Sequence, residues 1–131
     1  MSALAEALVA AQKELPTAIG RDSQGYRYTS LDKLIEETRP ILTKHGLSIS
    51  QWPSYVAFGG GLRPTLMTKI QHTSGEYLDE RCPLYVTDKT MQGLGAAITY
   101  ARRYAWAAAL GIASEEDTDA ATLKAEEDVP F

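Results

Sequence analysis

Apolar residues recur every three or four positions in the first third of the chain, which is the spacing of a helix with one buried face. The pattern predicts one helix that starts after Ser2 and ends before Pro16. It predicts a second helix that opens at residues 29–32, is kinked or split at Pro40 and ends at Gly46. The residues between the two helices are typical of a loop (20–25) followed by a short strand (26–28).

Apolar and polar residues alternate through the middle of the chain, as they do in strands that are exposed on one face. The alternation predicts two short strands, residues 47–52 and 55–58, with a flexible break at the glycines 59–61. A β-hairpin follows, with residues 62–72 and 76–86 as its strands. One face of its first strand carries Leu66 and Ile70, and the other face carries Arg63, Thr65, Met67, Lys69 and Gln71.

The last periodic segment predicts the longest helix of the chain, from near Asp88 to about Leu110, with Gly111 as its stop. Tyr100 and Tyr104 form an i,i+4 pair on one flank of this helix. Its apolar side is formed by Leu94, Ile98, Ala101, Ala105 and Ile112.

The net charge of −4 is unevenly distributed along the chain. Residues 1–114 hold 12 Lys and Arg against 10 Asp and Glu, a net of +2, whereas residues 115–131 hold 7 acidic residues against Lys124, a net of −6. A mildly basic body with an acidic tail is a recurring layout of nucleic-acid-handling proteins. Because periodicity also ends after Ser114, we expect a folded core over residues 1–114 and a disordered acidic tail over residues 115–131.

Length and composition exclude several classes of protein. A chain of 131 residues with 44% apolar and 23% charged residues suits a single soluble domain. No apolar run is long enough to span a membrane, and the N-terminus lacks the features of a secretory signal. One cysteine, Cys82, cannot form a disulfide framework, so we expect a protein of the reducing cytoplasm without a membrane partner.

The chain lacks a convincing catalytic or metal-binding constellation. His45 and His72 form no paired motif, and the glycines 59–61 are not followed by the Gly-Lys-Ser/Thr of a phosphate loop. Cys82 has no adjacent base and is interpreted as a small, half-buried hydrophobe. The sequence therefore predicts that the protein is not an enzyme, with no catalytic residue, metal or cofactor; a nuclease in particular would need a carboxylate cluster that is absent.

The segment TYARRY at residues 99–104 carries chemistry that suits single-stranded nucleic acid. The guanidinium groups of Arg102 and Arg103 bind phosphates, and the rings of Tyr100 and Tyr104 accept unstacked bases. The same residues also have structural interpretations: Arg103 as a solvated helix charge, Arg102 in an ion pair with a hairpin carboxylate, and the tyrosines as cover for the edge of the core. Spacing alone leaves both interpretations open.

Two further places add positive charge that is suited to DNA. The hairpin face with Arg63 and Lys69 is a candidate second strip for phosphate contacts. Lys89, near the start of the longest helix, favours a phosphate together with the helix dipole.

The chain ends in DVPF, after an acidic run. A peptide with acidic residues, an aromatic side chain and a free carboxylate docks in hydrophobic pockets with basic rims. A solvated tail is the alternative. The candidate partner-binding residues are Asp128, Val129, Pro130 and Phe131.

The run QGLGAAITYARRY at residues 92–104, followed by LGIA at residues 110–113 and an acidic stretch, resembles the ERF family. These are phage and prophage single-strand annealing proteins, named for essential recombination function. The resemblance covers about residues 2–117. It is supported upstream, in the family's order, by YRYTSL (26–31), RPIL (39–42), KHGL (44–47) and HTSGE (72–76).

The resemblance implies an ATP-independent recombinase that binds single-stranded DNA and pairs complementary strands in phage homologous recombination, in the cytoplasm of a bacterial host. It implies an α+β fold related to the ring-forming annealing proteins, with a β-hairpin or antiparallel sheet packed on a long helix and a homo-oligomeric ring or filament. DNA is then expected in a basic groove between hairpin and helix, contacted by Arg102, Arg103 and Lys69. A module that protects single strands or recruits partners, without annealing, is the alternative.

The C-terminus departs from the family pattern. The chain stops soon after the core, whereas longer members carry an extra C-terminal region. Its DVPF end instead resembles the C-terminal tip of bacterial single-strand DNA-binding proteins, which recruits repair and replication enzymes. The tail is therefore expected either to recruit host proteins that have tip-binding pockets or to compete with DNA for the basic groove.

Overall fold

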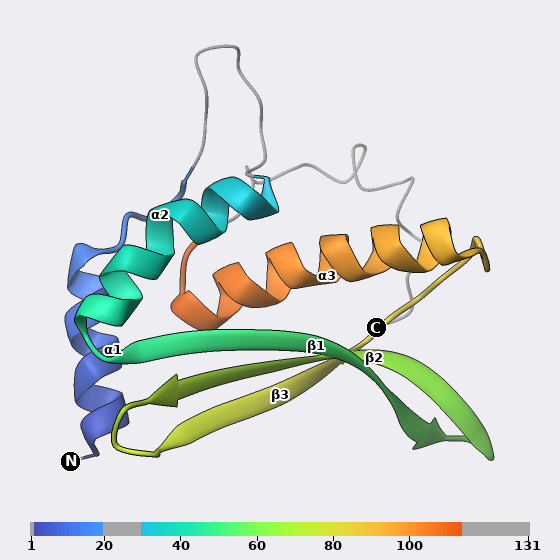
Figure 1. The fold of residues 1–131 in the computed structure, drawn as a ribbon, viewed down its shortest axis with the longest axis horizontal. Helices are drawn as coiled ribbons and strands as arrows, with labels where there is room; N and C mark the ends of the chain where they lie inside the picture. Colours follow the sequence, from blue (N-terminus) through green and yellow to red (C-terminus); the bar gives the residue numbers. More distant parts are fainter. Residues whose placement is uncertain (1, 20–29, 114–131) are drawn as a thin grey trace, which may run out of the picture.

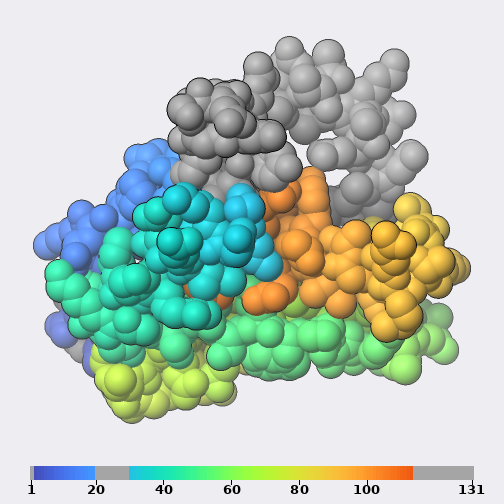
Figure 2. Space-filling model, turned by 45° about the horizontal axis from the view of Figure 1, so that its top comes forward, coloured from blue at the N-terminus to red at the C-terminus, as the bar shows by residue number. Residues whose placement is uncertain are grey.

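The computed structural model describes residues 2–19 and 30–113. They form three helices and a three-stranded antiparallel sheet, which is an α+β fold. The helix α3 (Met91–Leu110) runs along one face of the sheet, α2 (Leu31–Lys44) packs against α3, and α1 (Ala3–Glu14) crosses the end of the sheet (Figure 1). Figure 2 shows α2 and α3 side by side on top of the strands.

The sheet has the strand order β1-β2-β3, with β1 (Leu47–Phe58), β2 (Gly61–His72) and β3 (Tyr77–Pro83). The predicted hairpin is confirmed as β2 and β3. The two short strands predicted before it are wrong, because β1 is one continuous strand through Pro53. Proline is tolerated there because β1 is an edge strand, where an N–H group on the open side has no ladder partner to lose.

The glycines between β1 and β2 form a tight turn rather than the flexible break that was predicted. Phe58 pairs with Gly61, so Gly59 and Gly60 are a two-residue loop. Their φ angles are 58° and 84°, and a type I′ turn requires positive φ at both central positions. The turn creates a second hairpin, β1–β2, and sets the register of β1 against β2.

The first two helices follow the predicted apolar spacing. The Ser2 hydroxyl oxygen accepts a hydrogen bond from the Ala5 N–H at 3.0 Å and caps α1. Of the two outcomes predicted at Pro40, a kink or a split, the split is wrong, because α2 is a single helix. Pro40 is exposed, and so is Glu36, whose carbonyl loses its helical hydrogen bond; water can satisfy that carbonyl on this side of the helix.

The third helix begins at Met91, and its N-cap is Thr90, two residues after the cap that was expected near Asp88. The Asp88 carboxylate accepts a hydrogen bond from the Thr90 N–H at 3.2 Å, and the Thr90 hydroxyl oxygen accepts one from the Gly93 N–H at 3.0 Å. Residues 88–90 therefore form the capping loop of α3. The predicted end is confirmed, because Gly111 follows the helix with a left-handed φ of 74°.

The core consists of two clusters of buried side chains. The smaller is formed by Leu66, Leu84 and Ala101, which join β2 to α3; three predicted members of the apolar stripe, Leu94, Ile98 and Ala105, pack against it. The larger surrounds the C-terminal half of α3 and contains Trp106, which the predicted stripe did not include. Its other members are Leu4, Ala7, Ala11, Ile19, Leu34, Leu42, Leu47, Ile70, Ala107, Leu110 and Ile112.

The predicted loop 20–25, the strand 26–28 and the acidic tail 115–131 lie outside the described residues.

The turn between β2 and β3 is tied to the first helix by Glu76. Its carboxylate accepts a hydrogen bond from the Leu4 N–H at 3.0 Å and another from the Ser74 hydroxyl at 3.0 Å. The bond from the Leu4 N–H, followed by that from Ser74, lowers the pKa of Glu76 below its ordinary value. An acidic residue from a distant turn thus occupies the positive end of the α1 dipole.

We expect Glu76→Gln to destabilise the protein at neutral pH, because the helix end loses a negative charge. A carboxyl with a lowered folded pKa contributes stability above its unfolded pKa, near 4.5, and loses it as the pH falls through the folded value. The difference between wild type and variant in urea melts should therefore shrink below about pH 4.5. Glu80→Gln, in the same hairpin, is the control, and an equal effect of both variants would contradict the assignment.

Candidate nucleic-acid interface

Two tyrosines and an arginine form a cluster on α3. The Tyr100 hydroxyl donates a hydrogen bond to the Tyr104 hydroxyl at 3.1 Å, and the two ring centroids are 4.7 Å apart. The Arg103 guanidinium carbon lies 5.1 Å from the Tyr100 ring centroid and 5.5 Å from that of Tyr104. The i,i+4 spacing predicted the tyrosine pair, and the i,i+3 spacing of Tyr100 and Arg103 brings the guanidinium to the same side of the helix.

Arg103 points away from the sheet, and the two tyrosines lie on the flank of the helix beside it. Ala101 faces β2 in the core, and Arg103, two residues further along, is rotated by about 200° around the helix. Tyr100 is 44% exposed, whereas Arg103 and Tyr104 are half-buried. A guanidinium held close to two aromatic rings offers a phosphate contact and a ring face within one helical turn.

Arg102 belongs to a different environment. Its Nε donates a hydrogen bond to the side-chain oxygen of Gln51 at 3.4 Å, and the Gln51 side-chain amide donates to the Arg102 carbonyl at 3.2 Å. The same amide donates to the Thr68 hydroxyl oxygen at 3.1 Å. Gln51 of β1 therefore anchors Arg102 to the sheet. Among the described residues Arg102 has no carboxylate partner, so contacts with glutamine stand in place of the ion pair that the structural interpretation expected.

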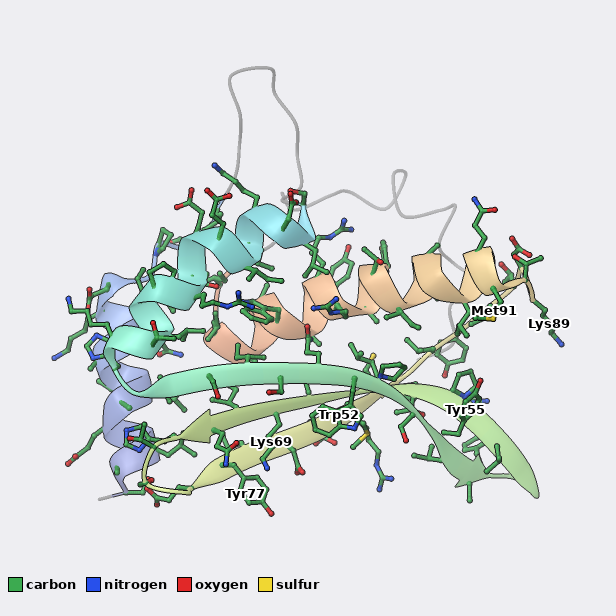
Figure 3. All side chains as sticks on the ribbon, viewed as in Figure 1. Trp52, Tyr55, Lys69, Tyr77, Lys89 and Met91 are labelled. Carbon is green, nitrogen blue, oxygen red and sulfur yellow. The ribbon has the colours of Figure 1, made fainter. Side chains whose placement is uncertain are left out.

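Lys69 and Arg63 lie on the sheet face that is turned away from α3. The predicted alternation of β2 is confirmed by burial of Leu66 and Ile70 on the helix-bearing face, although Thr65 on the opposite face is buried as well. Lys69 and Tyr77 point together away from the helices (Figure 3), with the ammonium 4.3 Å from the ring centroid.

Arg63 is held at the far end of the same face by two aromatic rings. Its guanidinium carbon lies 3.9 Å from the Phe58 ring centroid and 5.2 Å from that of Tyr85. Its Nη1 also donates a hydrogen bond to the Tyr85 hydroxyl at 3.2 Å. Because Arg63 and Lys69 are six residues apart on β2, they are separated by about 20 Å along the strand.

Lys89 is exposed in the capping loop, two residues before the start of α3 (Figure 3).

The seven predicted DNA-binding residues therefore do not converge on one groove. The expected groove between hairpin and helix is filled by Leu66, Leu84 and Ala101, where α3 packs directly on β2. Arg103 lies on the far side of α3, and Lys69 lies on the far side of the sheet. A single chain thus presents two separate basic and aromatic surfaces, and Arg102 lies between them.

The aromatic partners of the basic residues were not predicted from the sequence: Trp52, Phe58, Tyr77 and Tyr85. They come from three separate segments. The register of the sheet places Trp52, Phe58 and Tyr77 on one face, and a contact with Arg63 brings Tyr85 to it. A signal was present in β1, where Trp52 and Phe58 fall at alternate positions of one strand. The alternation was not recognised because residues 47–58 were predicted as two strands separated at Pro53.

Two findings concern the groups that were considered for metal binding or nucleophilic chemistry. No group of three or more His, Cys, Asp or Glu side chains in residues 2–19 and 30–113 is arranged to hold a metal ion. Cys82 is half-buried against the smaller core cluster, and burial raises the pKa of its thiol, which disfavours the reactive thiolate.

No helix in the described part of the chain has the length and apolar character needed to cross a membrane.

The candidate tail residues lie outside the described part of the chain, and so does the acidic run before them. They are Asp128, Val129, Pro130 and Phe131.

Comparison with known proteins adds one finding to this geometry. Neither the curated proteins nor the solved structures give a significant match. The model of the ERF superfamily matches residues 2–129, which includes all three helices, the sheet and the Tyr100–Arg103–Tyr104 cluster. The chain belongs to the ERF superfamily.

Proposed function

We propose that this protein is an ATP-independent single-strand annealing protein, which binds single-stranded DNA and pairs complementary strands in phage recombination. The observation that carries the proposal is the family match over residues 2–129, which contains the arginine-tyrosine cluster of α3. A nucleotide-driven mechanism has no support from the glycines 59–61, because they form a hairpin turn.

Annealing requires no bond chemistry, so binding groups alone can perform it. Arg103 neutralises a phosphate, and Tyr100 offers a ring face to a base beside it. Neutralised phosphates reduce the repulsion between two strands, which lets complementary bases sample pairing. We propose that copies of the chain assemble into a ring or filament, because aligned protomers hold many nucleotides of one strand in the same orientation.

We propose that the tail ending in DVPF recruits host proteins that bind similar C-terminal tips. The alternative role, competition with DNA for the basic surfaces, follows from its net charge of −6. Removing residues 115–131 distinguishes them, because the first role predicts lost partner binding and the second predicts tighter DNA binding.

The function is tested by mixing two complementary fluorescent oligonucleotides with the purified protein, without nucleotide or metal, over a series of salt concentrations. We expect faster duplex formation that fades as salt increases, with a slope near 0.7 in log affinity per phosphate neutralised. Binding without acceleration would replace annealing by strand protection. Absence of binding would contradict the proposal as a whole.

Arg103→Ala is expected to weaken single-stranded DNA binding by about 10- to 150-fold, because a charge-assisted contact is worth about 1.5–3 kcal/mol. The salt slope should fall by about 0.7. Fluorescence anisotropy with a labelled oligonucleotide measures both quantities. Arg39→Ala removes an exposed arginine of α2 and is the matched control. Equal affinities of the two variants, or an unfolded Arg103→Ala protein, would favour a structural role for Arg103.

A further inference from the structure

The outer face of the sheet, turned away from α3, carries an alternating series of aromatic and basic side chains. Ring contacts place Arg63 beside Phe58 and Tyr85. The register of β2 places Met67 between Trp52 and Arg81, and Lys69 one row from Tyr77. We name this set the outer aromatic face. It consists of Trp52, Phe58, Arg63, Met67, Lys69, Tyr77, Arg81 and Tyr85.

The rings of this face are accessible. Trp52 is 41% exposed, Tyr77 53% and Phe58 60%. The neighbours of Trp52 on the same face of β1 are serines at positions 50 and 54, which are too short to cover the indole. In Figure 3, Trp52, Lys69 and Tyr77 lie on the side of the sheet opposite to α3.

The charge of the face favours a polyanion. Within the strands, the outer positions contain Arg63, Lys69 and Arg81 against Asp79. The Lys69 ammonium and the Arg63 guanidinium are both held over rings, so a basic group and a stacking surface occur together at each end of the face.

A second protein copy is the poorer occupant, because the cores of protein interfaces are depleted in charged residues. Here cations alternate with the aromatic side chains, and short serines replace the large aliphatic residues of a buried interface core. Bases that stack on rings while basic groups contact the phosphates are the recognition mode of single-stranded nucleic acid.

We propose that the outer aromatic face is a base-stacking surface for single-stranded DNA, separate from the cluster on α3, with Trp52 as its central platform. The inference rests on the proposed function, because it assigns a second surface to the same ligand. It gives Lys69 a site on the open face of the sheet instead of a groove shared with α3.

The two tryptophans of the chain provide a direct readout. Trp52 is exposed, whereas Trp106 is 3% exposed in the core, so a base that stacks on the protein surface quenches Trp52 alone. Titration with oligothymidylate is expected to give saturable quenching that weakens with salt. In Trp52→Phe the quenching should disappear while the affinity, measured by anisotropy, stays close to that of wild type, because phenylalanine also stacks.

The affinity test compares aromatic residues on the two faces of the hairpin. Trp52→Ala is expected to weaken oligothymidylate binding about tenfold or more, as loss of one stacked base would. Lys69→Gln should lower the salt slope by about 0.7. Tyr55→Ala is the matched control, because Tyr55 is 59% exposed but lies on the helix-bearing face of the same strand.

The outcomes separate this inference from the proposed function. If wild type binds DNA but Trp52 is not quenched and Trp52→Ala binds as wild type does, the outer face is not the site, although the function stands. A loss with Tyr55→Ala and none with Trp52→Ala would place DNA on the helix-bearing face and overturn the inference. Loss of self-assembly in Trp52→Ala, measured by light scattering, without a change in DNA affinity would identify the face as a contact between copies. If no DNA binds to wild type, both proposals fail.

Discussion

Trp106→Ala is expected to lower the free energy of unfolding by about 3–5 kcal/mol, a large part of the roughly 5–15 kcal/mol that holds a typical domain together. The indole is 3% exposed and belongs to the larger core cluster, where α3 meets α1 and α2. Its removal leaves a cavity that close-packed neighbours only partly fill. Urea unfolding followed by circular dichroism measures the loss.

The indole also completes a buried hydrogen-bond chain. The Trp106 Nε1 donates to the Thr38 hydroxyl oxygen at 2.9 Å, and that hydroxyl donates to the Leu34 carbonyl at 2.8 Å. Thr38→Val keeps the volume but leaves the indole N–H without an acceptor, which should cost about 1–3 kcal/mol. Val9→Ala, at a 54% exposed site of α1, is the surface control. If Trp106→Ala were no more harmful than Val9→Ala, the indole would not be a core element.

Gly93→Ala is expected to destabilise the protein, whereas Gly95→Ala, two residues along the same helix, is expected to stabilise it. A methyl group on Gly93 would meet the Asp88 carbonyl oxygen and would lie 2.8 Å from the Asp88 Cβ. The capping loop must then move, at a cost of about 1–3 kcal/mol. A methyl group on Gly95 would meet no described atom within 4 Å apart from the adjoining backbone of its own helix, so alanine should raise the stability by about 0.5–1 kcal/mol through its better helix propensity.

Thermal melts of the two variants show whether the contact with Asp88 outweighs the higher helix propensity of alanine at position 93. Stabilisation by both substitutions would show that Asp88 does not require a glycine at position 93. The second readout is DNA binding, because both glycines belong to the run that resembles the family motif. If Gly95→Ala is more stable but binds DNA less tightly or assembles less completely, a ligand or a second copy approaches the helix at that exposed position.

The sequence predicted the elements whose signal is local. Helical spacing predicted α1 and α3, alternation predicted the β2–β3 hairpin, and Gly111 predicted the end of α3. The pairing of Tyr100 with Tyr104 followed from the same spacing, since residues four apart meet on a helix surface. The family could also be identified from the sequence, because the run at residues 92–104 is a continuous stretch of one helix.

The predictions that failed depended on edges and on register. A proline such as Pro53 interrupts a strand only where a neighbouring strand needs its N–H. Pro40 leaves α2 whole because the carbonyl that it frees is exposed. Neither condition is visible in a local pattern. The prediction that the basic residues share one groove failed for a related reason. Alternation shows that Lys69 and Leu66 lie on opposite faces of β2, but it does not show which face α3 covers.

Local periodicity therefore determined which residues form helices, which form the hairpin and which tyrosines meet on α3. Only the tertiary structure decided that Gln51 anchors Arg102, that Glu76 caps a helix 72 residues away, and that Trp52, Tyr77 and Arg63 share an open face. These contacts join segments that are distant in the sequence. Their partners are selected by strand register and by packing over the whole chain, which no single stretch of sequence encodes.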